Sequence, residues 1–137
     1  MVTNTRSNAL KKTLAGDRIE FSLPLEKRFA SILRLAVSAI GTKMDFSWDQ
    51  IEDIKTAAEE AFLLSMKSQK QKSIDILFDI SKEGLDITLE NTHLSSDLKD
   101  SSEERLSFFI LTGLMDDVIV EPDGNNAFVL KMTKRFW

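Results

Sequence analysis

Cysteine is absent from this chain, and histidine occurs only once, at position 93. The first absence excludes disulfides and thiolate metal sites, and the second argues against a histidine metal cluster or a Ser/His/Asp triad. Cations are in the minority, because 18 Lys and Arg against 22 Asp and Glu give a net charge of −4. That balance argues against nonspecific nucleic-acid binding, which depends on excess positive charge.

Long apolar runs are missing as well. No segment is long enough to span a membrane, and the N-terminus has no apolar run of signal-peptide length. We therefore expect a cytoplasmic protein without a membrane partner. The 137 residues, of which 42% are apolar, are enough to bury one core without cross-links. We expect residues 1–16 to be a polar extension and residues 17–137 to form a single domain.

Hydrophobic periodicity predicts five strands and three helices. The strands are expected at 19–23, 74–80, 85–89, 118–120 and 128–133, and the helices at 27–40, 47–68 and 104–115. Ser47 followed by Gln50 is a capping box for the second helix, and Gly41 is the expected stop of the first. This order predicts an α+β fold, a two-layer sandwich in which three helices cover one face of a mostly antiparallel five-stranded sheet.

Four stretches carry a resemblance to a known family. They are LRLAVSAIG (33–41), IEDIKTAAEEA (51–61), LMDDV (114–118) and VLKMTKRF (129–136). In this order and spacing the chain resembles the small bacterial anti-sigma factors that are also serine-protein kinases, within the GHKL (histidine-kinase-like) ATPase superfamily. The resemblance covers residues 19–136 and implies the Bergerat fold, which has the same order of elements.

The family holds ATP with three patches, and the first lies on the second helix. Glu60 matches a glutamate that polarises the attacking group. Leu64 stands where the family has an asparagine that holds Mg²⁺, and a leucine has no oxygen to offer a hard cation. Glu60 is then a relic general base or an ordinary solvated helix glutamate, and we favour the solvated interpretation.

The other two patches are also altered. After the third strand, Asn91 takes the place of an aspartate that reads the adenine amino group, and His93 takes the place of a glycine. At the start of the third helix, Arg105 and Ser107 replace two glycines of a phosphate-cradling turn. The resemblance therefore implies a nucleotide site whose motifs are degenerate in all three places.

Two further features are read from single positions. Arg34 matches an arginine that helps to dock the protein partner in the family, and the alternative is a surface arginine without a partner. Phe109 and its neighbour Phe108 are expected in the core.

The leading hypothesis is an anti-sigma-like regulator that binds a sigma factor or an anti-anti-sigma protein by partner switching. The resemblance implies a homodimer, and the altered motifs imply that no cofactor is needed. The alternative is an active serine/threonine kinase that uses ATP and Mg²⁺, with Glu60 as base, to phosphorylate an anti-anti-sigma protein. A structural or dimerisation domain without a sigma-factor connection is a third possibility.

Overall fold

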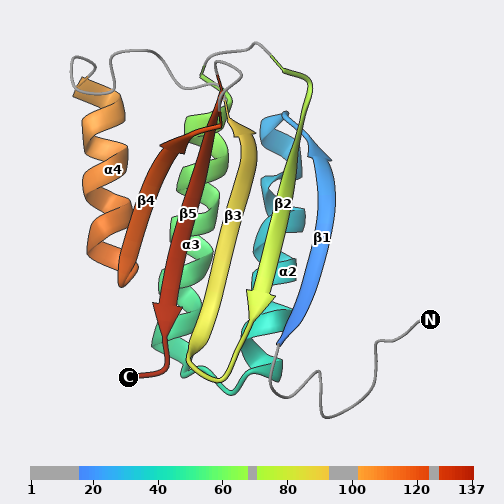
Figure 1. Cartoon of the computed structure of the whole chain (residues 1–137), viewed down its shortest axis with the longest axis vertical. Coiled ribbons are helices and arrows are strands. Elements are labelled where there is room, and N and C mark those ends of the chain that lie inside the picture. Colours follow the sequence, from blue (N-terminus) through green and yellow to red (C-terminus); the bar gives the residue numbers. More distant parts are fainter. Residues whose placement is uncertain (1–15, 68–70, 93–101, 124–126) are drawn as a thin grey trace.

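The computed structural model describes residues 16–67, 71–92, 102–123 and 127–137, with only the backbone at 91 and 92 (Figure 1). Five strands form one sheet in the order β1-β2-β3-β5-β4, and every neighbouring pair is antiparallel. The strands are β1 (Asp17–Pro24), β2 (Ser73–Ile80), β3 (Gly84–Thr92), β4 (Asp117–Pro122) and β5 (Phe128–Arg135). The first strand therefore lies at an edge of the sheet.

Three α-helices pack on one face of this sheet. They are α2 (Ala30–Lys43), which follows a 3₁₀ turn at Lys27–Phe29, α3 (Trp48–Ser65) and α4 (Ser102–Leu114). In Figure 1 the sheet stands in front of α2 and α3, and α4 lies beside β4. The predicted α+β two-layer sandwich is confirmed. No helix in the described ranges is long and apolar enough to cross a membrane.

Strand alternation explains why the sheet has one buried face. Successive side chains of a strand point to opposite faces, so every second residue meets the helices. The buried strand residues include Ile74, Ile76, Phe78, Leu85, Ile87, Leu89, Leu130 and Met132. Leu33 and Val37 of α2 and Ile54, Ala58 and Phe62 of α3 pack against them from the other layer. No helix formed by the described residues covers the opposite face of the sheet (Figure 1).

The predicted stop of the first helix at Gly41 is wrong, since α2 continues to Lys43. Gly41 lies buried within the helix. A Cβ added at this position would lie 2.9 Å from Ile51 Cγ1. The glycine is therefore explained by the close approach of α3 and not by a left-handed cap.

The start of α3 is held by the predicted capping box. The Ser47 side chain accepts a hydrogen bond from the Gln50 backbone N–H, and the Gln50 side chain accepts one from the Ser47 N–H. The Gln50 amide nitrogen also donates to the carbonyls of Arg135 and Phe136. The Phe136 ring stacks on Phe46 at 4.6 Å between centroids. These contacts fix α3 against the C-terminal end of the chain.

Two smaller predictions differ from the structure. The second helix ends at Ser65 and not at 68. Phe109 is 76% exposed although it was expected in the core, whereas Phe108 does pack against the core. The two rings are neighbours on α4, so they project about 100° apart and only one of them reaches the sheet layer.

Candidate functional site between α3 and α4

The carboxylate of Glu60 on α3 is held by a residue of α4. Ser107 Oγ donates a hydrogen bond of 2.8 Å to Glu60 Oε2. Ser107 is buried, with 5% of its surface exposed, and Glu60 is half-buried. The interpretation of Glu60 as a plain solvated glutamate is therefore wrong, because a neighbouring helix occupies one of its oxygens. The structure thus brings together one residue of the first patch and one of the third.

A second bridge joins α4 to the turn that follows α3. Lys67 Nζ lies 3.1 Å from Glu103 Oε2. The contact moves forward along the chain from Glu60 of α3 to Lys67, while it moves backward along α4, from 107 to 103. The two helices are therefore antiparallel along this contact, and the bridges mark its two ends.

Leu64 lies between these two bridges. It is one helical turn after Glu60, so its side chain projects from the same face of α3. Only 1% of its surface is exposed, and the facing stretch of α4 contains Glu104, which is also buried. Leu64 is therefore buried on the face of α3 that carries Glu60, at a position between the residues of the two bridges.

This arrangement does not fit a magnesium ion at position 64. Mg²⁺ requires oxygen ligands in near-octahedral geometry, and a buried leucine side chain contributes none. The nearest carboxylate on the same helix face, that of Glu60, is engaged by Ser107. Within the described ranges no group of three or more His, Asp or Glu side chains is arranged to hold a metal ion.

The remaining nucleotide-site positions are Arg105, Asn91 and His93. Arg105 lies on α4 and is exposed. Asn91 belongs to the last part of β3, but its side chain is outside the described part of the chain. His93 lies outside the described residues altogether. For the second patch, the structure therefore gives the backbone position of Asn91. The roles of the Asn91 and His93 side chains stay predictions.

Arg34 projects from α2 toward α3. Its Nη1 lies 2.7 Å from Glu59 Oε1, and the two side chains are 33% and 36% exposed. Leu35, the next residue along α2, is 70% exposed. Arg34, Leu35 and Lys55 line a shallow hollow together with Ser31 and Ser38. The guanidinium is thus held in place beside an exposed apolar side chain.

Sequence reasoning missed several partners of these residues. Glu59, Glu103 and the role of Ser107 as a donor were not assigned. The sequence contains a partial indication, since Glu103 and Ser107 are four residues apart and share a face of α4. Which helix that face meets depends on the packing of α4, so the pairs were not predictable from spacing alone.

The five-stranded antiparallel sheet with its helices on one face is consistent with a Bergerat-type sandwich. No protein-family model matches the chain. Curated relatives that carry the name serine-protein kinase RsbW do align with it. The one from Bacillus licheniformis is 29% identical, over 88% of this chain and 86% of the relative. Those from Listeria innocua and Bacillus subtilis are 28% and 25% identical, over 83% and 86% of this chain and 85% of each relative. The resemblance to the anti-sigma serine kinases is therefore confirmed.

Proposed function

We propose that this protein is a cytoplasmic regulator that acts by stoichiometric protein binding, in the manner of an anti-sigma factor. Its partner is a sigma factor or an anti-anti-sigma protein, and its working form is a homodimer. In this proposal the ancestral nucleotide site no longer binds Mg·ATP. The observation that carries this is the burial of Leu64 at the position where the family holds its metal.

The engagement of Glu60 supports the same conclusion. A general base has to be within hydrogen-bond reach of the hydroxyl it activates. Here the hydroxyl of Ser107 already bonds the carboxylate, and Ser107 belongs to the same chain. A substrate hydroxyl would compete with Ser107 for this oxygen, Oε2, of the carboxylate.

The docking surface of this proposal is centred on Arg34. Arginine and large apolar side chains are frequent anchors of protein interfaces. Glu59 holds the guanidinium at 2.7 Å, which reduces the side-chain entropy that binding would otherwise remove. The neighbouring Leu35 and Ile32 are 70% and 44% exposed. Together they form a basic and apolar patch on α2 that is preorganised for a partner.

Thermal unfolding with nucleotide tests the proposal. A ligand that binds only the folded state at 100 times its Kd stabilises by about 2.7 kcal/mol, or roughly 10 °C for a chain of this size. We expect no shift of Tm in millimolar Mg·ATP or Mg·ADP. The serine-protein kinase of Bacillus subtilis, measured under the same conditions, is the positive control. A clear Mg²⁺-dependent shift in the present protein would refute the proposal.

The active kinase is the second candidate, and the retention of Glu60 on a helix that resembles a kinase favours it. In this case the Mg²⁺-dependent shift is present and is abolished by Glu60→Ala or by Asn91→Ala. Phosphate transfer from ATP to a serine of an anti-anti-sigma protein would accompany it. Glu52→Ala, on the same helix but outside the α3–α4 contact, is the matched control.

Partner binding needs a separate experiment, because a missing nucleotide shift does not identify a partner. Affinity capture from the native host is expected to recover a sigma factor or an anti-anti-sigma protein with the wild-type chain and less of it with Arg34→Ala. Recovery of neither would favour a purely structural or dimerisation domain.

A further inference from the structure

The sheet face opposite the helices carries an excess of carboxylates. Alternate strand residues point to this face, because their neighbours in the chain are in the core. Its cations each have an acidic partner on the same face: Arg18 with Asp79, Lys131 with Asp86 and Arg135 with Asp117. Within the described part of the chain, the other acidic residues of this face form no salt bridge of their own.

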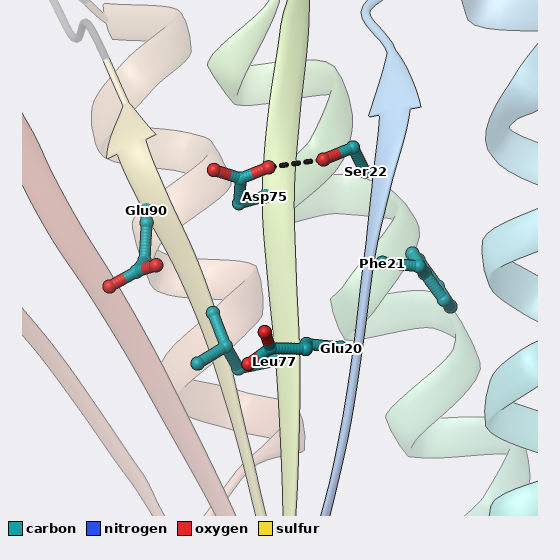
Figure 2. A pocket seen from close by; sticks show the side chains of 6 residues that line it. All are labelled: Glu20, Phe21, Ser22, Asp75, Leu77 and Glu90. Atoms are coloured by element: carbon teal, nitrogen blue, oxygen red, sulfur yellow. Dashed lines mark hydrogen bonds between the residues drawn. The ribbon is translucent and has the colours of Figure 1, made fainter.

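Three of these other carboxylates gather at one place. Glu20 on β1, Asp75 on β2 and Glu90 on β3 line a hollow of about 340 Å³ with Ser22 and Leu77 (Figure 2). Asp75 and Glu90 are direct cross-strand partners in the register of β2 and β3. Like charges in that position destabilise a sheet. The unfavourable pair is therefore built into the strand register.

A comparison within the same sheet shows what is missing. Asp79 and Asp86 are also direct cross-strand partners, and there Arg18 and Lys131 supply the compensating charges. Among the described residues, no cation forms a salt bridge with Asp75 or Glu90, and the neutral hydroxyl of Ser22 donates to Asp75 Oδ1.

The carboxylates that line the hollow also act on Arg18 of β1. The Asp79 carboxylate raises the pKa of the Arg18 guanidinium, first through the hydrogen bond between them and then through its charge, and Glu20 and Glu90 add to the increase. The three carboxylates are not arranged to chelate a metal ion, since no such group occurs in the described ranges. An extended cationic chain fits this spacing better than a point charge.

The chain contains such a segment directly before β1. Residues 1–15 lie outside the described part of the structure, and their sequence has three of the 18 Lys and Arg, at 6, 11 and 12, and none of the 22 Asp and Glu. Their net charge is thus +3 in a chain whose total is −4. The segment is therefore basic and free of acids over its whole length.

Its reach matches the position of the hollow. Gly16, the last residue before β1, has a φ of +82°, and a Cβ there would lie 2.0 Å from the Ile80 carbonyl oxygen. A glycine in this left-handed conformation permits a chain reversal. Lys11 and Lys12 precede it by four or five residues, roughly 13–17 Å of extended chain. Glu20 follows it by four residues along β1, at about 13 Å.

We propose that residues 1–15 dock in cis on this acidic sheet face, with Lys11 and Lys12 beside Glu20, Asp75 and Glu90. The segment then supplies the positive charge that the strand register lacks, and it covers the hollow with its own side chains. A second copy of the chain and a basic partner protein are the competing occupants, and the experiment separates them.

A spin label tests the contact in the full chain. The sequence has no cysteine, so Ala9→Cys creates a unique site for a nitroxide. We expect the label to abolish the amide NMR signals around the hollow on β1, β2 and β3. Lys11→Glu with Lys12→Glu should restore them, as should about 1 M salt, where the Debye length is about 3 Å. Lys27→Glu with Lys43→Glu changes the charge equally and should restore nothing.

Variants of the sheet face supply the reciprocal evidence. Glu20→Gln with Glu90→Gln should also restore the signals, whereas Glu121→Gln, on the same face at the far strand β4, should not. A fourfold variant exchanges the charges: it combines Glu20→Lys and Glu90→Lys with Lys11→Glu and Lys12→Glu. In this variant the spin label should again abolish the amide signals around the hollow.

Three results would overturn the proposal. The first is that the spin label leaves the amide signals around the hollow unchanged, or that it weakens signals evenly over the whole surface. The second is a charge exchange that fails to restore the contact. The third is signal loss in a mixture of spin-labelled unenriched chains and unlabelled ¹⁵N chains, because that would assign the face to a second copy.

Discussion

Replacement of Leu64 tests directly whether the contact between α3 and α4 is sealed. Leu64→Asn introduces the residue type that holds Mg²⁺ in the family. The leucine is 1% exposed and lies between the Glu60–Ser107 and Lys67–Glu103 bridges, so the new amide would be buried. If the position were instead the wall of an open polar cleft, the amide would be hydrated and the change would be mild.

The expected cost can be worked out from two contributions. Removal of a fully buried leucine side chain forfeits about 1.5–3 kcal/mol of burial free energy. A buried amide without partners adds about 1–3 kcal/mol. The sum, about 3–6 kcal/mol, is a large part of the total stability of about 5–15 kcal/mol that a domain of this kind has. Leu64→Met keeps the volume and should cost less than about 1.5 kcal/mol.

Urea unfolding followed by circular dichroism measures the difference. Small domains usually unfold in one cooperative step, and the slope m is about 1–3 kcal/mol per M urea. Leu64→Asn should therefore lower the midpoint by roughly 2 M, and Leu64→Met by less than about 1 M. The reasoning is refuted if Leu64→Asn unfolds within about 0.5 kcal/mol of the wild type, which is the range of an ordinary surface change. It is refuted equally if the wild type, with Leu64 in place, shows a Mg²⁺-dependent shift of Tm with ATP.

Three further changes follow from single contacts. In Gly41→Val the added Cβ would lie 2.9 Å from Ile51 Cγ1, so this variant should lose about 1–3 kcal/mol of stability in urea unfolding. Gly113→Ala is the control, because nothing lies within 4 Å of its added Cβ, and it should be more stable than the wild type by up to about 1 kcal/mol. Ser47→Ala removes the capping box and should cost about 1 kcal/mol, while Ser47→Asp keeps an acceptor and should retain most of the stability; equal losses would contradict the cap assignment. Arg34→Ala should change the free energy of unfolding by less than about 1 kcal/mol, since the pair with Glu59 is a third exposed, but should weaken partner binding at least fivefold in calorimetry. Unchanged affinity for Arg34→Ala would remove this residue from the proposed docking surface.

Much of the fold follows from local patterns. The strands at 74–80 and 85–89 were predictable because their alternation has a period of two, which only a half-buried strand satisfies. The start of α3 was predictable from Ser47 and Gln50, because a capping box involves residues three positions apart. The end of α2 was not, because Gly41 has a second use as a helix-packing residue, and sequence alone does not distinguish it from a stop.

The candidate site was predictable in its chemistry and not in its contacts. That position 64 offers no metal ligand is decided by the residue type. That Glu60 is half-buried and bonded, and that Phe109 is exposed, depends on where α4 packs. The side chains of Asn91 and His93 lie outside the described residues, so their part in a nucleotide site stays a prediction.

The sequence by itself determined the order of the elements, the resemblance to the serine-protein kinases and the loss of an oxygen ligand at Leu64. These are properties of single residues and of neighbours within a turn or a strand, where backbone geometry sets the distances. Only the tertiary structure decided that Ser107 bonds Glu60, that Arg34 bonds Glu59 and that Asp75 faces Glu90. Their partners are 15 to 47 positions away in the chain. Contacts at that separation depend on helix packing and strand register, which the whole core determines together.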